Sequence, residues 1–315
     1  MEKIAVLIPC YNEEVTIEKV IKDFRKELPD ADIYVYNNNS KDKSKELALK
    51  AGAIVIDEYK QGKGNVVRSQ FRDVEADIYV MVDADDTYPA EMVHKLIEPI
   101  KTGQADMTIG DRLSNGTYYK ENKRAFHDLG NNLVRFLINR LFKANIRDIM
   151  TGYRAFSKRF VKNMPVVSRK FEIETEMSLY ALDKNYTIKE IPIDYRDRPE
   201  GSVSKLNTFK DGIKVLRTIQ RMYRSYKPLK FYGFIAAVLF ILGLIVGIPV
   251  IMEFIETKYI SKVPSAVLAT GLMSLTAIFM QCGIILNSIE RRNKENYELN
   301  ILRYEQIEKL KRKME

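Results

Sequence analysis

Two aspartates one residue apart, Asp83 and Asp85, are the side chains of this 315-residue chain best suited to chemistry. They follow the apolar run 78–82, which is typical of a buried strand. Burying two carboxylates so close together is costly unless a positive charge lies between them. A divalent metal ion that carries a nucleotide diphosphate supplies that charge, because hard cations bind carboxylate and phosphate oxygens. The alternative is a turn that holds two solvated aspartates.

The elements that would position these aspartates alternate along the first 110 residues. The expected strands are 4–8, 33–36, 53–56, 78–82 and 107–109. The expected helices are 14–28, 41–51, 65–74 and 89–100. This alternation predicts an α/β fold, with a mostly parallel sheet covered on both faces by helices. Such sheets bind ligands at the carboxyl ends of their strands.

Polar residues follow four of the expected strands at that edge. They are Tyr11-Asn12-Glu13, Asn37-Asn38-Asn39-Ser40, Asp83-Ala84-Asp85 and Asp111-Arg112. Tyr11 could stack on a base, and Glu13 could accept hydrogen bonds from a base or a ribose. The asparagines suit ribose and uracil edges, although an Asx-type turn before a helix would use the same residues. Glycines on both sides of Lys63 permit close backbone approach, and Lys63 could reach a phosphate. The spacing is not that of a P-loop, which argues against an ATPase.

The C-terminal part of the chain predicts a membrane hairpin. The stretches 231–254 and 263–287 are nearly all apolar, and each is long enough to span a hydrocarbon core of about 30 Å. Basic residues precede the first stretch: Lys210, Lys214, Arg217, Arg221, Arg224, Lys227 and Lys230. Arg291, Arg292 and Lys294 follow the second stretch, whereas the connection carries only Lys258 and Lys262. This distribution predicts that both ends of the hairpin lie in the cytoplasm.

These patterns divide the chain into a cytoplasmic α/β domain (1–205), a juxtamembrane region (206–230), the hairpin, and a charged cytoplasmic tail (288–315). The juxtamembrane region is amphipathic, so it would lie flat at the lipid headgroups or pack on the domain. The tail would form a short coiled coil or a solvated helix. The net charge of +9 indicates anionic partners, and its concentration beside the apolar stretches favours a membrane over nucleic acid. The two cysteines are expected to be reduced, and the N-terminus shows no signal peptide.

Taken as an ordered set, these motifs resemble those of family-2 glycosyltransferases with a GT-A fold. The motifs are 8–13, 37–42, 62–64, 83–86, 110–112, 151–154, Arg198 and 204–206. Together with the hairpin, the set is similar to the polyprenyl-phosphate glycosyltransferases, such as the bactoprenol glucosyl transferases and dolichyl-phosphate mannose synthase. The resemblance covers nearly the whole chain.

The resemblance implies inverting transfer of a monosaccharide from a nucleotide sugar, UDP-glucose or UDP-N-acetylglucosamine, to undecaprenyl or another polyprenyl phosphate, for cell-envelope glycan modification. It implies that Asp83 and Asp85 hold Mg²⁺ or Mn²⁺. The nucleotide-sugar ligands that it implies are Pro9, Tyr11, Glu13, Tyr36, Asn38, Lys63, Asp83 and Ala84. The acceptor-phosphate ligands that it implies are Arg112, Arg124, Arg198 and Lys205. A phosphate monoester is largely ionised at neutral pH, so this acceptor scarcely needs a general base.

Asp148 precedes 151–154 at the place where such enzymes carry a catalytic or positioning acid. A buried ion pair with Arg154 or Arg147 would explain this aspartate equally well.

The sequence differs from related glycosyltransferases at two points that bear on its donor and its product. Relatives usually carry an aspartate among the three residues that are Asn37, Asn38 and Asn39 here, which leaves the base open between uracil and guanine. The chain has no tryptophan, so it lacks the Gln-x-x-Arg-Trp motif of processive polymer synthases. There are two alternative functions. One is transfer to a hydroxyl acceptor such as a diacylglycerol, and the other is that of a non-catalytic membrane scaffold. A homo-oligomer joined through the charged tail is also open.

Overall fold

The structure, a computed structural model, describes residues 2–116, 127–199, 201 and 208–314. The predicted acceptor ligands Arg124 and Lys205 lie outside the described residues. The chain forms two compact units, Met1–Ile219 and Gln220–Glu315.

Unit 1 is built on a seven-stranded sheet with the order β3-β2-β1-β4-β6-β5-β7. The strands are β1 (Ile4–Cys10), β2 (Asp32–Asn37), β3 (Ile54–Asp57), β4 (Ile78–Met81), β5 (Met107–Asp111), β6 (Arg154–Ser157) and β7 (Ile188–Pro192). β6 runs antiparallel to β4 and to β5, and the other neighbouring pairs are parallel. The mostly parallel α/β fold predicted from the sequence is therefore confirmed, with β6 and β7 added to the five expected strands.

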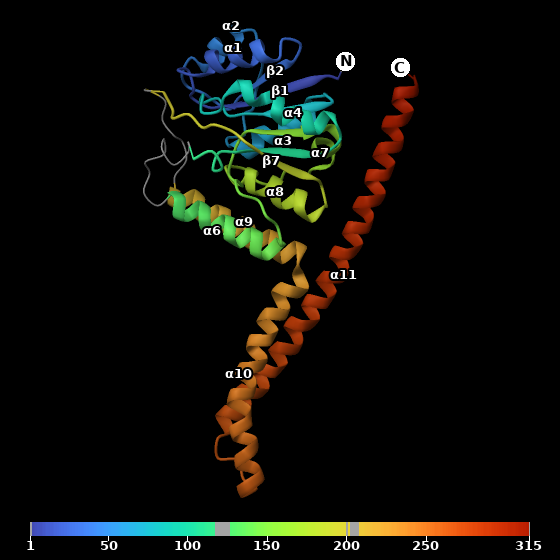
Figure 1. Cartoon of the computed structure of the whole chain (residues 1–315). Helices are drawn as coiled ribbons and strands as arrows, with labels where there is room; N and C mark the ends of the chain where they lie inside the picture. The colour runs from blue at the N-terminus through green and yellow to red at the C-terminus, as the bar shows by residue number, and fades with distance from the viewer. Residues whose placement is uncertain (1, 117–126, 200, 202–207, 315) are drawn as a thin grey trace. The chain divides into compact units, whose positions relative to one another are not determined.

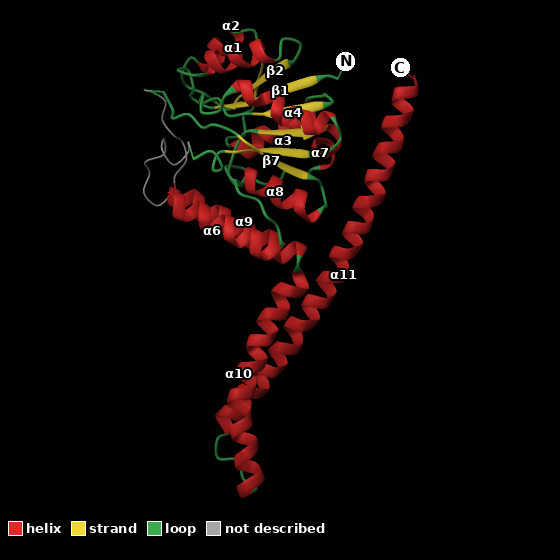
Figure 2. Cartoon of the chain, viewed as in Figure 1, coloured by secondary structure: helices red, strands yellow, loops and turns green. Residues whose placement is uncertain are grey.

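Helices connect the strands of unit 1, and Figure 2 shows the strands lying between them. The α-helices of this unit are α1 (Ile17–Glu27), α2 (Ser44–Lys50), α3 (Lys63–Asp73), α4 (Val93–Lys101), α6 (His127–Phe142), α7 (Lys158–Asn163) and α8 (Ile173–Asp183). A 3₁₀ turn, η1 (Ala90–Met92), leads into α4. In α1 the buried side chains are Ile17, Val20, Ile21 and Phe24, the spacing expected of one helix face.

The core of unit 1 lies on both faces of the sheet. Val6 and Ile8 of β1 join one apolar cluster that includes residues of α1 and α4. Leu7, between them, is equally buried although its side chain points to the opposite face, where α3 contacts β1. β1 is accordingly a continuous apolar run, as expected for a strand covered on both sides.

Unit 2 contains a helical hairpin of α10 (Pro228–Thr257) and α11 (Val263–Met314), preceded by α9 (Thr208–Tyr226), which crosses the boundary between the units (Figure 1). A Cβ on Gly243 would lie 3.3 Å from Met273 Sδ, and one on Gly247 would lie 3.3 Å from Ala269 Cβ. These two glycines, four residues apart on α10, therefore let α11 approach closely, as small residues do between membrane helices. In the predicted tail, residues 288–314 are helical and continue α11 as far as Met314.

Both hairpin helices are long and apolar enough to cross a membrane. Only 17% of the apolar window in α10 is buried inside the structure, and 0% of the corresponding window in α11 is buried. The core helix of a soluble protein would be mostly buried, so this low burial favours a membrane span over a core helix.

Candidate active site

A cleft of about 320 Å³ opens at the carboxyl ends of the strands of unit 1. Its walls include the end of β1, Asn38 directly after β2, the loop that follows β4, and Arg112 directly after β5. The structure brings ten of the predicted site residues into this one cleft: Pro9, Tyr11, Glu13, Asn38, Lys63, Asp83, Ala84, Asp85, Arg112 and Arg198. The edge of the sheet on which the sequence placed the site is therefore where the structure places the cleft.

Two predicted residues lie elsewhere. Tyr36 is fully buried in β2 and is not part of the cleft wall, and burial raises the pKa of its hydroxyl above the ordinary value. Its hydroxyl has no hydrogen-bond partner among the described residues. Asp148 is 3% exposed and lies behind Arg112 rather than on the wall. Tyr36 pairs with Pro9 in the β1–β2 ladder, but its ring is enclosed in the core and does not reach the cleft.

Each aspartate of the central pair contacts a cation. Lys63 bonds Asp83 and also Glu174, with 2.5 Å between Lys63 Nζ and Glu174 Oε1. Arg198 bonds Asp85 and lies 3.7 Å from a carboxylate oxygen of Glu13. Lys63 and Arg198 are therefore the middle members of two carboxylate–cation–carboxylate groups.

The charges of this centre are coupled. Burial raises the pKa of Asp85, and the neighbouring Asp83 adds to that effect, whereas Arg198 opposes it. Burial alone would lower the pKa of Lys63, but Asp83 and Glu174 outweigh it and raise that pKa above its ordinary value. Lys63 is therefore a firmly charged ammonium group at neutral pH. Asp85 is held further by the Thr87 hydroxyl, which donates to Asp85 Oδ1 at 2.7 Å.

Asp83 and Asp85 fit a metal ion that arrives with its own ligands. Across residues 2–116, 127–199, 201 and 208–314, no group of three or more His, Cys, Asp or Glu side chains is arranged to hold a metal. Mg²⁺ is ordinarily bound by one or two carboxylates together with substrate phosphates, rather than by a cage made wholly of protein. Two neighbouring carboxylates on the wall of an open cleft match that requirement.

Gly152 forms the surface behind Asp83. A Cβ at this position would lie 2.3 Å from Asp83 Oδ2, so only glycine leaves room for the carboxylate. The Gly152 amide donates to the hydroxyl of Tyr88, a residue of the cleft wall, at 3.0 Å, which fixes this backbone behind the cleft. The 151–154 motif therefore contributes its backbone to the site.

Asp148 pairs with Arg112. Arg112 Nε donates to Asp148 Oδ2 at 2.7 Å, and Arg112 Nη2 donates to Asp148 Oδ1 at 2.8 Å. Of the partners proposed from the sequence, Arg147 donates to Ser114, and Arg154 donates to the carbonyls of Thr151 and Ile149. Burial lowers the pKa of Arg154 to about 10, so its guanidinium remains charged at neutral pH. The buried ion pair expected for Asp148 therefore exists, but with a different arginine.

The asparagine loop is occupied by contacts within the chain. Asn38 Oδ1 accepts a hydrogen bond from the Gly62 amide at 2.7 Å, and Asn38 Nδ2 donates to the carbonyls of Glu58 and Lys60. Asn37 Oδ1 accepts from the Ser40 amide, as in an Asx-type turn. Asn38 thus anchors the loop that presents Lys63 to the cleft.

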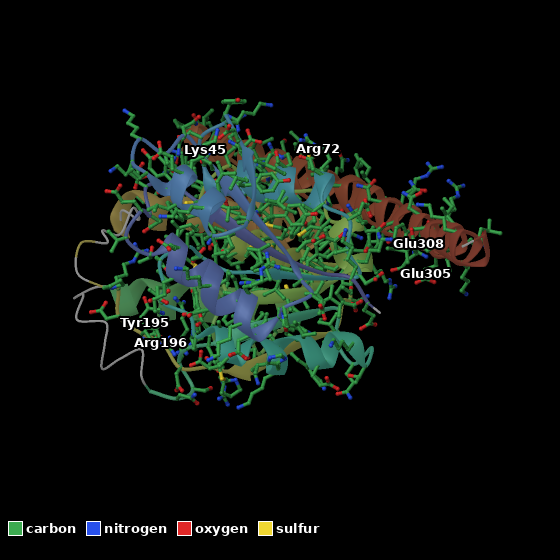
Figure 3. The ribbon with its side chains drawn as sticks, turned by 90° about the horizontal axis from the view of Figure 1, so that it is seen from above. Lys45, Arg72, Tyr195, Arg196, Glu305 and Glu308 are labelled. Atoms are coloured by element: carbon green, nitrogen blue, oxygen red, sulfur yellow. The ribbon has the colours of Figure 1, made fainter. Side chains whose placement is uncertain are left out.

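Several residues of the cleft wall were not among the predicted site residues, and they include Tyr88, Lys170, Phe171, Glu174 and Tyr195. The Arg112 guanidinium lies over the Tyr195 ring at 5.6 Å from the centroid, and Figure 3 shows Tyr195 beside Arg196 in the segment after β7. The sequence held one signal for Glu174. It is one of two glutamates in the segment 173–183, which is otherwise rich in apolar residues and which the structure shows as the buried helix α8. Acidic side chains are rarely buried without a partner or a function.

Residues 5–164 match the family model described as glycosyl transferase family 2. This chain belongs to glycosyltransferase family 2. The glycosyltransferase is 30% identical over 276 residues to Glycosyltransferase AglJ of Haloferax volcanii, an alignment that covers 86% of this chain and 89% of the relative. It is 29% identical over 221 residues to a dolichyl-phosphate hexose transferase of the same organism, with coverage of 70% and 94%.

Solved structures support the GT-A fold of the glycosyltransferase. A glucosyl-3-phosphoglycerate synthase from Mycobacterium tuberculosis, in complex with Mn²⁺, UDP-glucose and phosphoglyceric acid, superposes with a TM-score of 0.58. The match covers 70% of this chain and 80% of that chain at 21% identity. At this identity the likeness establishes the fold, and the site has to be argued from the residues of this chain.

Proposed function

We propose that this glycosyltransferase transfers a monosaccharide from a UDP-sugar to the phosphate of undecaprenyl or another polyprenyl phosphate, with inversion, at the cytoplasmic face of a membrane. The observation that carries the proposal is the cleft itself, which is lined by a pair of aspartates and by two arginines. An acidic pair suits a metal-bound diphosphate, and guanidinium groups suit an anionic acceptor. The name of the dolichyl-phosphate hexose transferase of Haloferax volcanii supports the same acceptor class.

The donor would occupy the side of the cleft formed by the ends of β1 and β2. Tyr11 and Glu13 would contact the nucleoside, and Lys63, anchored through the Asn38 loop, would contact the diphosphate. Asp83 and Asp85 would hold Mg²⁺ or Mn²⁺, which when bound supplies positive charge to the departing diphosphate.

The acceptor phosphate would lie against Arg112 and Arg198. One of its oxygens forms a bond to the anomeric carbon while the bond from that carbon to the diphosphate oxygen breaks, and the nucleoside diphosphate leaves. Attack from the face opposite the leaving group inverts the anomeric centre. The acceptor is already ionised, so no side chain has to remove a proton. Asp148 would act as a positioning residue that orients Arg112.

The hairpin would place this chemistry at the lipid surface. The basic residues that flank the two apolar stretches, 231–254 and 263–287, support a topology with unit 1 and both chain ends in the cytoplasm. The corresponding division is a catalytic domain (1–205), a headgroup-binding region (206–230), two spans (231–254 and 263–287) and a tail (288–315).

The decisive experiment offers undecaprenyl phosphate and undecaprenol, side by side, to the purified full-length chain with radiolabelled UDP-glucose, UDP-N-acetylglucosamine or GDP-mannose and Mn²⁺. We expect labelled lipid from the phosphate and a UDP-sugar, and no product with Asp85→Asn or with excess EDTA. Transfer to undecaprenol alone would support a hydroxyl acceptor instead. A folded chain that binds no nucleotide in calorimetry would support a scaffold.

A further inference from the structure

Both aspartates proposed to hold the metal ion are already neutralised by cations of the chain. Lys63 bonds Asp83, and Arg198 bonds Asp85. Each cation also contacts a second carboxylate that lies outside the proposed metal pair, Glu174 for Lys63 and Glu13 for Arg198. The same arrangement thus occurs twice, on opposite members of one acidic pair.

These contacts are partly shielded from water. The side chains of Lys63 and Asp85 are 10% and 8% exposed, and those of Arg198 and Asp83 are 22% and 27% exposed. At such burial, charges interact more strongly than at the surface, because the surrounding dielectric is low. A divalent ion and an ammonium or guanidinium group would repel each other if both contacted the same carboxylate. Metal binding therefore requires the resident cation to move or to lose its contact.

We propose, resting on the metal-dependent function above, that Lys63 and Arg198 are resident counter-ions which a divalent metal displaces from Asp83 and Asp85. Glu174 and Glu13 are the carboxylates that keep the displaced cations in the cleft. Glu174 is thereby a positioning residue, because it holds Lys63 beside the metal without itself contacting the ion.

Displacement has a consequence for the order of binding. Arg198 is one of the two described arginines proposed to contact the acceptor phosphate, and its contact with Asp85 competes with that role. A guanidinium has five N–H donors, so Arg198 released from Asp85 can keep its contact with Glu13 and still reach a phosphate. Metal with its donor nucleotide therefore prepares the acceptor site, and the two ligands bind with positive coupling.

The first test measures Mn²⁺ binding alone, by electron paramagnetic resonance on the full chain in detergent. Lys63→Gln and Arg198→Gln each remove a competitor, so we expect each to bind Mn²⁺ about tenfold more tightly than wild type, within the usual range of coupling between sites. Lys170→Gln is the matched control. Lys170 lines the same cleft but forms no ion pair among the described residues, so this variant reports the general effect of losing one positive charge.

A rise in affinity no larger than that of Lys170→Gln would overturn the displacement. Circular dichroism of each variant checks that it is folded. Wild-type chain that binds no Mn²⁺, alone or with UDP, would overturn the proposed metal dependence and this inference together. If wild type binds Mn²⁺ but Lys63→Gln and Arg198→Gln bind it no more tightly, the displacement is overturned while the metal dependence stands.

The second test is a double-mutant cycle between Lys63 and Glu174. Glu174→Gln leaves displaced Lys63 without its second carboxylate, so Mn²⁺ binding should weaken about fivefold, a coupling of ordinary size between contacting residues. The same substitution in the Lys63→Gln background should change nothing, because no ammonium remains to be held. A loss of affinity that persists in that background would show that Glu174 acts directly on the metal and not through Lys63.

Discussion

Asp148 binds the guanidinium of Arg112 through both carboxylate oxygens, at 2.7 and 2.8 Å. The Arg112 amide donates to the same carboxylate at 3.2 Å, so the backbone after β5 and the side chain are held together. Paired contacts of this kind fix the plane of an arginine as well as its position. The contact leaves Arg112 Nη1 near the Tyr88 hydroxyl, at 3.5 Å, on the wall of the cleft.

Asp148→Asn tests whether this aspartate positions Arg112. An amide cannot accept two charge-assisted hydrogen bonds, so Arg112 would lose its fixed orientation. We expect KM for polyprenyl phosphate to rise about tenfold and the chain to lose about 2 kcal/mol of stability, the usual cost of losing hydrogen bonds to a charged group. KM for the UDP-sugar should change little. Initial rates at varied acceptor and donor concentrations separate the two effects.

The matched control for Asp148→Asn is Asp73→Asn, which breaks the exposed pair between Arg72 and Asp73. Exposed ion pairs contribute little to stability, so this variant should behave like wild type. A fall in kcat with an unchanged acceptor KM would contradict the positioning role. That result would assign Asp148 a part in the chemical step itself.

Gly152→Ala tests the close approach to Asp83. The new methyl group would lie 2.3 Å from Asp83 Oδ2, and the carboxylate would have to rotate away from its present place. Because a side chain can move more readily than backbone, we expect stability to change little. Displacing a reacting group by about 1 Å can cost roughly a hundredfold in rate, so kcat/KM should fall by that order.

Gly233→Ala in α10 is the control for this substitution, because no heavy atom lies within 4 Å of its new Cβ. Steady-state rates and melting temperatures are compared for both variants. Full activity in Gly152→Ala would mean that the place of Asp83 is not critical.

The first 110 residues reveal their fold because each strand there is a compact apolar run bounded by helix-forming sequence. β6 and β7 carry a weaker signal. β6 spans four residues and begins with Arg154, a fully buried arginine that reads as a surface residue in the sequence. β6 lies antiparallel between β4 and β5. This place depends on pairing with strands that are distant in the sequence, which local periodicity does not encode.

The site could be foreseen to a similar extent. The carboxyl ends of parallel strands meet at one edge of the sheet, so the residues after β1, β2, β4 and β5 could be grouped without knowing their distances. The partner of Asp148 could not be predicted from the sequence. Arg112 is 36 residues away from Asp148, whereas two other arginines lie within six residues of it. Glu174 was missed for the same reason, since its contact with Lys63 joins α8 to α3 across 111 positions.

Asn38→Asp tests whether this loop requires an amide at position 38. Asn38 Nδ2 donates to the carbonyls of Glu58 and Lys60, and a carboxylate would meet those oxygens with no hydrogen to donate. We expect a loss of about 2 kcal/mol in stability, the usual cost of unsatisfied buried polar groups. Affinity for UDP should fall too, because the loop that carries Lys63 would move.

Asn39→Asp is the comparison for Asn38→Asp, since Asn39 is exposed and donates similarly to the Tyr59 carbonyl. Water can replace that hydrogen bond, so Asn39→Asp should lose much less stability than Asn38→Asp. Calorimetric titration with UDP and thermal unfolding measure both. Tighter UDP binding by Asn38→Asp would show that the amide had been limiting contact with the nucleoside.

Asp42→Asn tests the pH dependence of stability that arises in the loop between β2 and α2. Burial would raise the pKa of Asp42, but hydrogen bonds from the Ser44 hydroxyl and amide and from the Glu14 amide outweigh it and lower that pKa. A carboxyl whose folded-state pKa is lowered stabilises the fold above its unfolded value, near pH 4, and loses that contribution as pH falls through the folded value. The stability difference between wild type and Asp42→Asn should therefore be largest near neutral pH and should shrink below about pH 4. Asp30→Asn controls for the change in net charge. The chain has no tryptophan, so thermal unfolding is followed by circular dichroism; a difference that stays constant down to pH 3 would contradict the assignment.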